Sequence, residues 1–117
     1  RFITSFGRNV SPEWIECEIA QRLGGGQVLA CGESRPFVVA VIGAAAGDVP
    51  DALVERAIDA ANAVLPGYAQ VRRWARAPRP FSHADGTLTA NGRLRRTELH
   101  SRLATLLDDL YRAERAS

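Results

Sequence analysis

Apolar positions recur every three or four residues in three stretches of the chain, and each stretch is predicted to form an amphipathic helix. The first covers residues 11–23, where Ser11 stands at the N-cap and Pro12 at the first helical position. The second covers residues 50–65, and the last follows an arginine-rich stretch late in the chain. The side chains expected to face the core are Trp14, Ile15, Ile19 and Leu23 in the first helix, Val54, Ala57, Ile58, Ala61 and Leu65 in the second, and Leu99, Leu103, Leu106, Leu107 and Leu110 in the last.

The other apolar stretches have the patterns of strands. Residues 28–33 and 37–43 predict two strands joined by a turn around Ser34, and the second strand is continuously apolar, as a central strand covered on both faces would be. Residues 68–77 predict a strand at a sheet edge, and residues 2–5 predict a short strand followed by a turn. This order predicts an α+β fold: a small mixed sheet of about three main strands plus a short N-terminal hairpin, covered by three helices.

Length and composition are those of one globular domain, residues 1–117. Apolar residues make up 46% of the chain and charged residues 24%, which excludes a disordered tail. No apolar run approaches the roughly 20 residues that cross a bilayer, and no signal peptide opens the chain. Cys17 and Cys31 lack a pairing pattern, so we expect two reduced, buried thiols in a cytoplasmic protein. Because the chain has no methionine and begins at Arg1, we expect a piece of a longer protein.

The net charge is small, but it is uneven along the chain. All 15 basic residues are arginine, and the net charge is +2. Residues 72–102 carry eight arginines against two acids, so an anionic partner is plausible at this stretch. The arginines within residues 72–79 are equally consistent with a charged edge strand that resists self-pairing. A nucleic-acid-binding module is disfavoured, because only Trp74 and Phe81 supply aromatic rings in the basic stretch.

The sequence contains no recognisable self-contained active site. It lacks the Gly-x-Ser-x-Gly turn of a hydrolase, a dinucleotide-binding glycine pattern and a Cys/His pair at metal-ligand spacing, so no metal site is predicted. His83 and His100 each stand alone. The glycines at 24–26 follow a helix instead of preceding one, which indicates a helix C-cap and not a phosphate-binding loop. The chain is therefore not expected to be an enzyme on its own.

Three segments in order nevertheless match known motifs. Residues 7–16 have the pattern Gly, two variable residues, Val, a small residue, Pro and later Ile-Glu; residues 65–71 begin as "LPxYxx"; and residues 88–96 follow "LTxxGKxxR". The departures are Val71 in place of a proline and Arg93 in place of the lysine. Together the segments resemble the C-terminal domain of the adenylate-forming superfamily, whose members include acyl-CoA synthetases, luciferases and adenylation domains of nonribosomal peptide synthetases. An acyl-CoA synthetase is the most similar type.

The resemblance implies a two-step reaction. A carboxylate attacks ATP to give an acyl-adenylate and pyrophosphate, and a thiol such as coenzyme A then displaces AMP. In the family the C-terminal domain swings between two poses over a larger N-terminal domain, which is absent from this chain. In the first pose the motif lysine, here Arg93, bridges the carboxylate and the α-phosphate from a turn whose other motif residues here are Thr89, Asn91, Gly92 and Arg96. In the second pose the first motif lines the thiol channel, through Gly7, Arg8, Asn9 and Val10.

The resemblance also implies cofactors and partners. ATP, Mg²⁺ and coenzyme A would be bound mainly by the N-terminal adenylation domain, which would be the partner of this chain. The substrate would be a carboxylic acid such as a fatty acid, and an acyl carrier protein could supply the thiol instead of coenzyme A. The chain alone is expected to be folded and inactive.

The arginine at position 93 leaves three alternatives open. A guanidinium keeps the positive charge of lysine, but it is planar, bulkier and suited to bidentate contacts. Arg93 could do the work of the lysine, the parent enzyme could be specialised for the thioester step, or the parent could be a degenerate ligase whose domain only binds a partner. Outside the family, the remaining rival is a free-standing basic module.

Overall fold

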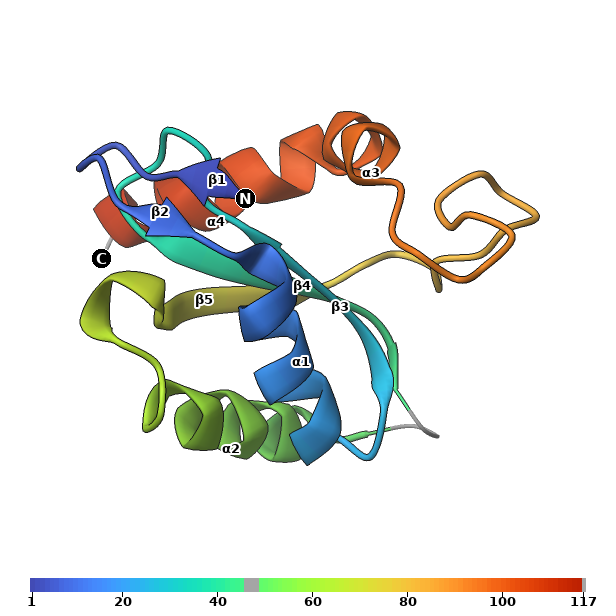
Figure 1. Ribbon diagram of the computed structural model, residues 1–117, viewed down its shortest axis with the longest axis horizontal. Helices are drawn as coiled ribbons and strands as arrows, with labels where there is room; N and C mark the ends of the chain where they lie inside the picture. The colour runs from blue at the N-terminus through green and yellow to red at the C-terminus, as the bar shows by residue number, and fades with distance from the viewer. Residues whose placement is uncertain (46–48, 117) are drawn as a thin grey trace.

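A three-stranded mixed sheet lies at the centre of the computed structural model, which describes the backbone of residues 1–45 and 49–116 and the side chains of 1–43 and 49–112. A two-stranded antiparallel hairpin lies beside it (Figure 1). In the sheet the central strand is antiparallel to one neighbour and parallel to the other. The hairpin strands are β1 (Phe2–Ile3) and β2 (Asn9–Val10), and the sheet, in spatial order, consists of β3 (Gly26–Cys31), β4 (Val38–Ala45) and β5 (Val71–Arg76).

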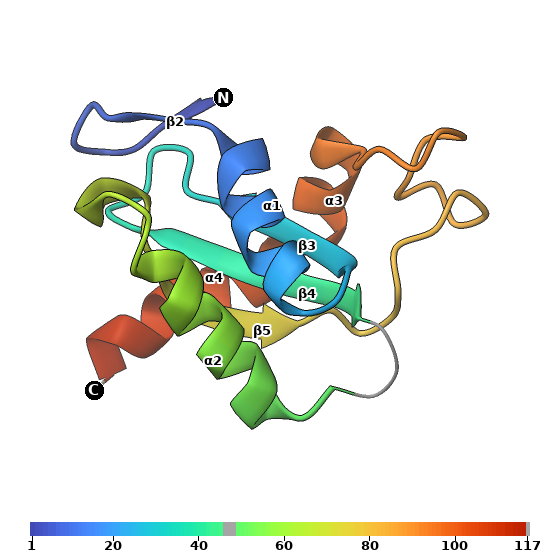
Figure 2. The ribbon, with the colours of Figure 1, turned by 60° about the horizontal axis from the view of Figure 1, so that its bottom comes forward.

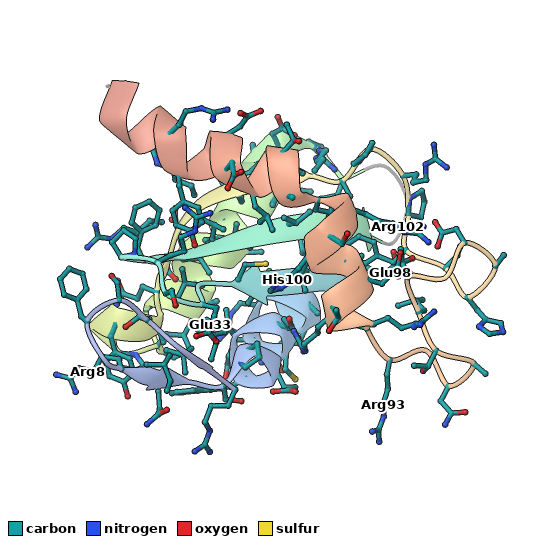
Figure 3. The ribbon with its side chains drawn as sticks, turned by 90° about the horizontal axis from the view of Figure 1, so that it is seen from above. Arg8, Glu33, Arg93, Glu98, His100 and Arg102 are labelled. Carbon is teal, nitrogen blue, oxygen red and sulfur yellow. The ribbon has the colours of Figure 1, made fainter. Side chains whose placement is uncertain are left out.

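Helices cover both faces of the sheet. One face carries α1 (Pro12–Arg22) and α2 (Asp51–Asn62), and the other carries α3 (Arg96–Arg102) and α4 (Ala104–Ala116) (Figure 2). The predicted α+β class, mixed sheet and N-terminal hairpin are confirmed. The helix count differs, because the single helix expected at the end of the chain is divided at Leu103, where the chain changes direction (Figure 3). The described part of the chain therefore has four α-helices.

The break at Leu103 preserves the leucine stripe. The Leu103 N–H donates to the Leu99 carbonyl at the end of α3, and the Leu107 N–H donates to the Leu103 carbonyl at the start of α4, both at 2.8 Å, so Leu103 is hydrogen-bonded to both helices. These three leucines are buried, and Leu106 and Leu110 pack beside them. The predicted apolar face is therefore confirmed, although it belongs to two helices.

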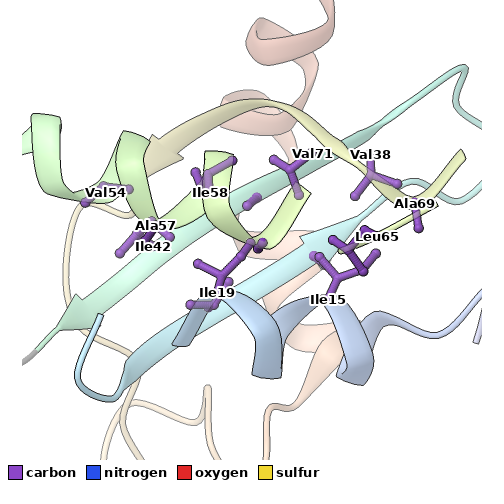
Figure 4. Packing of buried hydrophobic residues seen from close by; sticks show 14 of the residues in the cluster. Ile15, Ile19, Val38, Ile42, Val54, Ala57, Ile58, Leu65, Ala69 and Val71 are labelled. Atoms are coloured by element: carbon purple, nitrogen blue, oxygen red, sulfur yellow. The ribbon is translucent and has the colours of Figure 1, made fainter. Parts of the chain in front are cut away.

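Strand β4 is buried on both faces, as its continuous apolar sequence predicts. Val38, Ala40 and Ile42 pack toward α1 and α2, in a cluster that Figure 4 shows from close by. Val39 and Val41 pack toward α3 and α4. This alternation follows from the two-residue period of a strand, and it divides the core into two layers with β4 between them.

Helix α1 departs from the expected pattern at two side chains. Ile15 and Ile19 are fully buried as predicted, but Trp14 is 42% exposed. At about 100° per residue, Trp14 lies about 100° before Ile15 and Cys17 about 200° after it, so both lie outside the stripe formed by Ile15, Ile19 and Leu23. Cys17 is accordingly exposed, whereas the other cysteine, Cys31, is buried. The prediction of two buried thiols is thus wrong for Cys17.

The observed N-cap of α1, the turn after α1 and the start of β5 can be compared with the predicted ones. Ser11 occupies the N-cap position, but its hydroxyl donates to Glu13 Oε1 at 3.3 Å and makes no capping hydrogen bond to the backbone. Residues 24–26 all have positive φ, which confirms a glycine turn after α1. The predicted edge strand begins at Val71, because the preceding residues form a short 3₁₀ turn, η1 (Gly67–Ala69).

We expect Gly43→Ala to destabilise the domain by about 1–3 kcal/mol, the usual range for overpacking a filled site. A Cβ atom at Gly43 would lie 2.7 Å from the Phe81 ring, which packs on β4 at this position. Gly67→Ala is the matched control, because no atom lies within 4 Å of the added carbon. Urea unfolding of both variants measures the difference, and equal midpoints would contradict this packing.

Candidate functional site

The turn predicted to carry the adenylation cation is a small hairpin outside the main sheet. Leu88 and Leu94 form an antiparallel bridge. Between them the Thr89 N–H donates to the Arg93 carbonyl at 2.8 Å, and the Gly92 N–H donates to the Thr89 carbonyl at 2.9 Å. Gly92 has φ of +83°, as the last residue of a three-residue hairpin loop requires. The turn is therefore a defined structure whose glycine is required by the backbone.

Arg93 stands exposed at the end of this turn. Its N–H donates to the Thr89 hydroxyl at 3.0 Å, which fixes the point where the side chain begins. Figure 3 shows the guanidinium directed away from the body of the domain. Within the part of the chain that the structure describes, it takes part in no ion pair and lies over no aromatic ring. The role of Arg93 as the adenylation cation stays a prediction.

The hairpin between β1 and β2 repeats the same turn. The Thr4 N–H donates to the Arg8 carbonyl, the Gly7 N–H donates to the Thr4 carbonyl, and both distances are 3.0 Å. The Arg8 N–H donates to the Thr4 hydroxyl at 3.2 Å, and Gly7 has φ of +80°. Each turn reads Thr-x-x-Gly-Arg, as "TSFGR" and "TANGR". The sequence analysis did not identify Thr4 as the residue whose hydroxyl accepts the Arg8 N–H. The repeat of Thr-x-x-Gly-Arg at two places in the sequence could have indicated it.

The four residues expected to line a thiol channel divide into two groups. Gly7, Arg8 and Asn9 are exposed on the hairpin, whereas Val10 is only 2% exposed and belongs to the core. The side chain of Val10 therefore packs in the core beneath the sheet-side helices and is not available to line a channel. A channel role for the other three residues stays a prediction.

An ion pair joins the first and third motifs. The two terminal nitrogens of Arg96 donate to the two carboxylate oxygens of Glu16, each at 2.7 Å. Glu16 is 9% exposed, and its Oε2 also accepts the Ala30 N–H at 2.9 Å. Hydrogen bonding to Glu16 raises the pKa of the Arg96 guanidinium. Arg96, predicted as part of the terminal turn, thus anchors the start of α3 to α1 and β3.

The second motif meets the first at the other end of the hairpin. Arg8 lies over the ring of Tyr68, with its guanidinium carbon 5.1 Å from the ring centre. The Asn62 amide accepts the Val71 N–H and donates to the Val71 carbonyl, both at 2.9 Å, which fixes the chain after η1. The first motif therefore contacts the second through Arg8 and the third through Glu16.

The structure also places together two residues that the sequence showed only as isolated. Cys31 Sγ lies 3.6 Å from His100 Nε2. Burial raises the pKa of the Cys31 thiol to about 12, and burial also lowers the pKa of His100. The pair is accordingly a neutral thiol beside a neutral imidazole at pH 7, and not an activated nucleophile. Among the described residues there is no group of three or more metal ligands, and no helix there is long and apolar enough to cross a membrane.

A protein-family model described as AMP-binding enzyme C-terminal domain matches residues 1–115. The chain belongs to this family. The match confirms the resemblance to the adenylate-forming superfamily. The three motifs on which the resemblance was based, in residues 7–16, 65–71 and 88–96, all lie within this AMP-binding C-terminal domain. No curated protein matches it.

Two solved structures share the fold. One is the A-PCP didomain of carboxylic acid reductase from Segniliparus rugosus in complex with AMP, at 21% identity and a TM-score of 0.71; the match covers 96% of this chain and 17% of that chain. The other is the A domain of that enzyme with AMP and a co-purified carboxylic acid, at 21% identity and a TM-score of 0.69, covering 94% and 19%. The AMP-binding C-terminal domain thus spans less than a fifth of either structure.

We expect Glu16→Gln to destabilise the AMP-binding C-terminal domain by about 2 kcal/mol, because it removes the nearer, bidentate counter-charge of the partly buried Arg96 guanidinium and leaves only Glu13 at 3.6 Å. Glu18→Gln is the matched control on the same helix, since Glu18 pairs with Arg22 at the surface, where such a pair contributes well under 1 kcal/mol. Chemical denaturation compares the two. Equal losses in the free energy of unfolding would show that the Glu16–Arg96 ion pair contributes no more than a surface ion pair.

Thiol labelling tests the assignment of the two cysteines. In the native domain at pH 8, one thiol should react with a disulfide reagent, because Cys17 is exposed, whereas Cys31 is buried with a pKa of about 12. Two thiols should react after unfolding in guanidinium. The variant Cys17→Ser should show no fast native reaction; rapid labelling of this variant would mean that Cys31 is accessible and its burial is wrong.

Proposed function

We propose that this domain is the mobile C-terminal domain of an enzyme that activates a carboxylic acid with ATP and passes the acyl group to a thiol. The observation that carries the proposal is the exposed Arg93 guanidinium, held by the Thr89 turn and without a counter-charge among the described residues. The family match supports the enzyme context. An N-terminal adenylation domain would be its partner.

In this proposal Arg93 takes the place of the family lysine. The acid carboxylate and the α-phosphate of ATP repel each other, and a cation between them offsets that repulsion as negative charge develops on the phosphorus oxygens. A guanidinium can donate two parallel hydrogen bonds, so it can contact both anions with its separate N–H groups. The Thr89 hydroxyl contributes by fixing the backbone from which Arg93 extends.

The second half of the reaction would use the other turn. After the domain rotates, the Gly7–Asn9 segment would face the acyl-adenylate and the incoming thiol. Coenzyme A is the thiol we propose, and a carrier protein is the alternative, because one solved structure with this fold is an A-PCP didomain. The solved structures belong to a carboxylic acid reductase and not to an acyl-CoA ligase.

Most binding groups for ATP and Mg²⁺ would lie on the adenylation domain. The described side chains of this chain form no cluster of three or more metal ligands, so its own contribution would be the Arg93 cation. The acid is proposed only as a carboxylic acid, because no residue of this chain would contact its acyl tail. A cytoplasmic location stays a prediction from the unpaired cysteines.

Acid-dependent ATP–pyrophosphate exchange by the enzyme that contains this domain tests the role of Arg93. We expect Arg93→Ala to lower the exchange rate by about 10²–10³, as for loss of one transition-state donor, and Arg93→Lys to retain most of it. Arg95→Ala is the control, because Arg95 is an exposed neighbour that donates to the Gly86 carbonyl at 3.1 Å.

Other outcomes distinguish the alternatives. Equal rates for Arg93→Ala and the wild type would remove Arg93 from adenylation. No exchange with any acid, together with thioester formation from a supplied acyl-adenylate, would identify an enzyme specialised for the second step. No exchange and no thioester formation would identify a degenerate ligase.

A further inference from the structure

A pocket of about 230 Å³ lies between α3 and the segment that follows β5. It is lined by residues 77–81, by Asp85 and Thr87 from the turn before the Arg93 hairpin, and by side chains of α3 together with Leu103. Arg93 itself is not among the lining residues. We call this site the α3 pocket.

Hydrogen bonds attach the 77–81 segment to the main sheet. The side-chain amide of Gln27, on β3, donates to the Phe81 carbonyl at 2.6 Å and accepts the Phe81 N–H at 2.7 Å. At the other end of the segment the Ala77 N–H donates to the carbonyl of Ile42, on β4, at 2.9 Å. A pocket with a wall that is already fixed requires little ordering when a ligand enters.

The turn that contains Asp85 and Thr87 is fixed as well. Thr87 is buried, and its hydroxyl accepts the Ser82 N–H at 2.8 Å and lies 2.6 Å from Asp85 Oδ1, to which it donates. The Arg95 N–H donates to the Thr87 carbonyl at 3.0 Å, which joins the turn to the chain just before α3. The α3 pocket is therefore bounded by ordered backbone on both sides.

Much of the lining is apolar. Phe81, Leu99 and Leu103 are buried members of the core layer between β4 and the last two helices, and each also lines the pocket. A cavity of about 150 Å³ with such a lining takes up benzene. The α3 pocket therefore has room for a phenyl ring and a short chain.

Two arginines line the pocket beside this apolar surface. Arg102 Nε donates to Glu98 Oε2 at 2.7 Å, so its charge is partly compensated, and Figure 3 shows these two side chains next to each other on α3. Arg79 is exposed, and within the part of the chain that the structure describes it takes part in no ion pair and lies over no aromatic ring. Its N–H groups are available to an anion.

Asp85 is the acidic residue of the lining. Its Oδ1 accepts both the N–H and the hydroxyl of Thr87, at 3.1 and 2.6 Å. These hydrogen bonds lower the pKa of the Asp85 carboxyl, so it is ionised at pH 7. An anionic ligand is therefore expected to place its charge on Arg79 and away from Asp85.

We infer that the α3 pocket binds a small apolar carboxylate, with its apolar group against Phe81, Leu99 and Leu103 and its carboxylate on Arg79. A guanidinium donates two parallel hydrogen bonds to a carboxylate, which a neutral analogue of the same shape would not receive with equal strength. Apolar contact supplies affinity, and the cation selects the charged end. The inference goes beyond the proposed function, because it gives this domain a ligand site of its own.

Titration of the isotope-labelled 117-residue chain, followed through its backbone amide resonances, measures both affinity and location. The probe is 3-phenylpropionate. Its controls are 3-phenylpropanamide, which has the same shape without the charge, and acetate, which has the charge without the ring. We expect 3-phenylpropionate to bind about tenfold more tightly than either control, with the largest shifts within residues 77–87 and 99–103.

Variants assign the charged contact. Arg79→Ala should weaken 3-phenylpropionate binding by about tenfold and leave the amide unchanged, whereas Arg79→Lys should retain most of the affinity. Arg56→Ala is the matched control, because it removes an exposed arginine of α2 that does not line the pocket. Asp85→Asn keeps an oxygen acceptor for Thr87 and removes the nearby negative charge, so it should strengthen carboxylate binding by about two- to threefold.

Four results would overturn the inference: no saturable binding of 3-phenylpropionate up to about 10 mM, equal affinity for the carboxylate and the amide, the largest shifts outside the pocket, or an equal loss in Arg56→Ala. The amide spectrum of each variant shows that a loss does not come from unfolding. The titration involves no turnover, so its failure would leave adenylation by Arg93 untouched. Conversely, loss of a role for Arg93 in pyrophosphate exchange would leave a measured carboxylate affinity intact.

Discussion

The Glu16 carboxylate holds together the parts of the domain that carry the candidate chemistry. It accepts hydrogen bonds from both terminal nitrogens of Arg96 and from the Ala30 N–H, so three donors satisfy one nearly buried charge. A buried carboxylate without such partners would be strongly unfavourable. This requirement fixes α3 against α1 and β3. Because the Arg93 hairpin directly precedes α3, its position on the domain depends on the same ion pair.

The same hairpin turn, with the sequence Thr-x-x-Gly-Arg, occurs at residues 4–8 and at residues 89–93. In each turn a glycine takes the left-handed conformation that the loop needs, and a threonine hydroxyl accepts the N–H of the arginine four residues later. Each arginine therefore leaves the backbone from a fixed point and extends to the surface. In the proposed function, a rotation of the domain over one active site would exchange one turn for the other.

The positive stretch of the sequence is compensated in part in the fold. Arg76, Arg96 and Arg102 lie within residues 72–102, yet each pairs with a carboxylate. Counting charges along the chain overstated the cationic surface there.

The sequence by itself determined the features that depend on neighbouring residues. Helical spacing located the apolar faces, and the continuous apolar run located β4. These follow from backbone geometry and from periods of 3.6 and two residues, which a single segment contains. Tertiary structure decided the rest: the exposure of Trp14, the bend at Leu103, and contacts such as Glu16 with Arg96 across 80 residues. Those depend on how the helices pack on the two faces of the sheet, and no local pattern specifies which distant side chains that packing brings into contact.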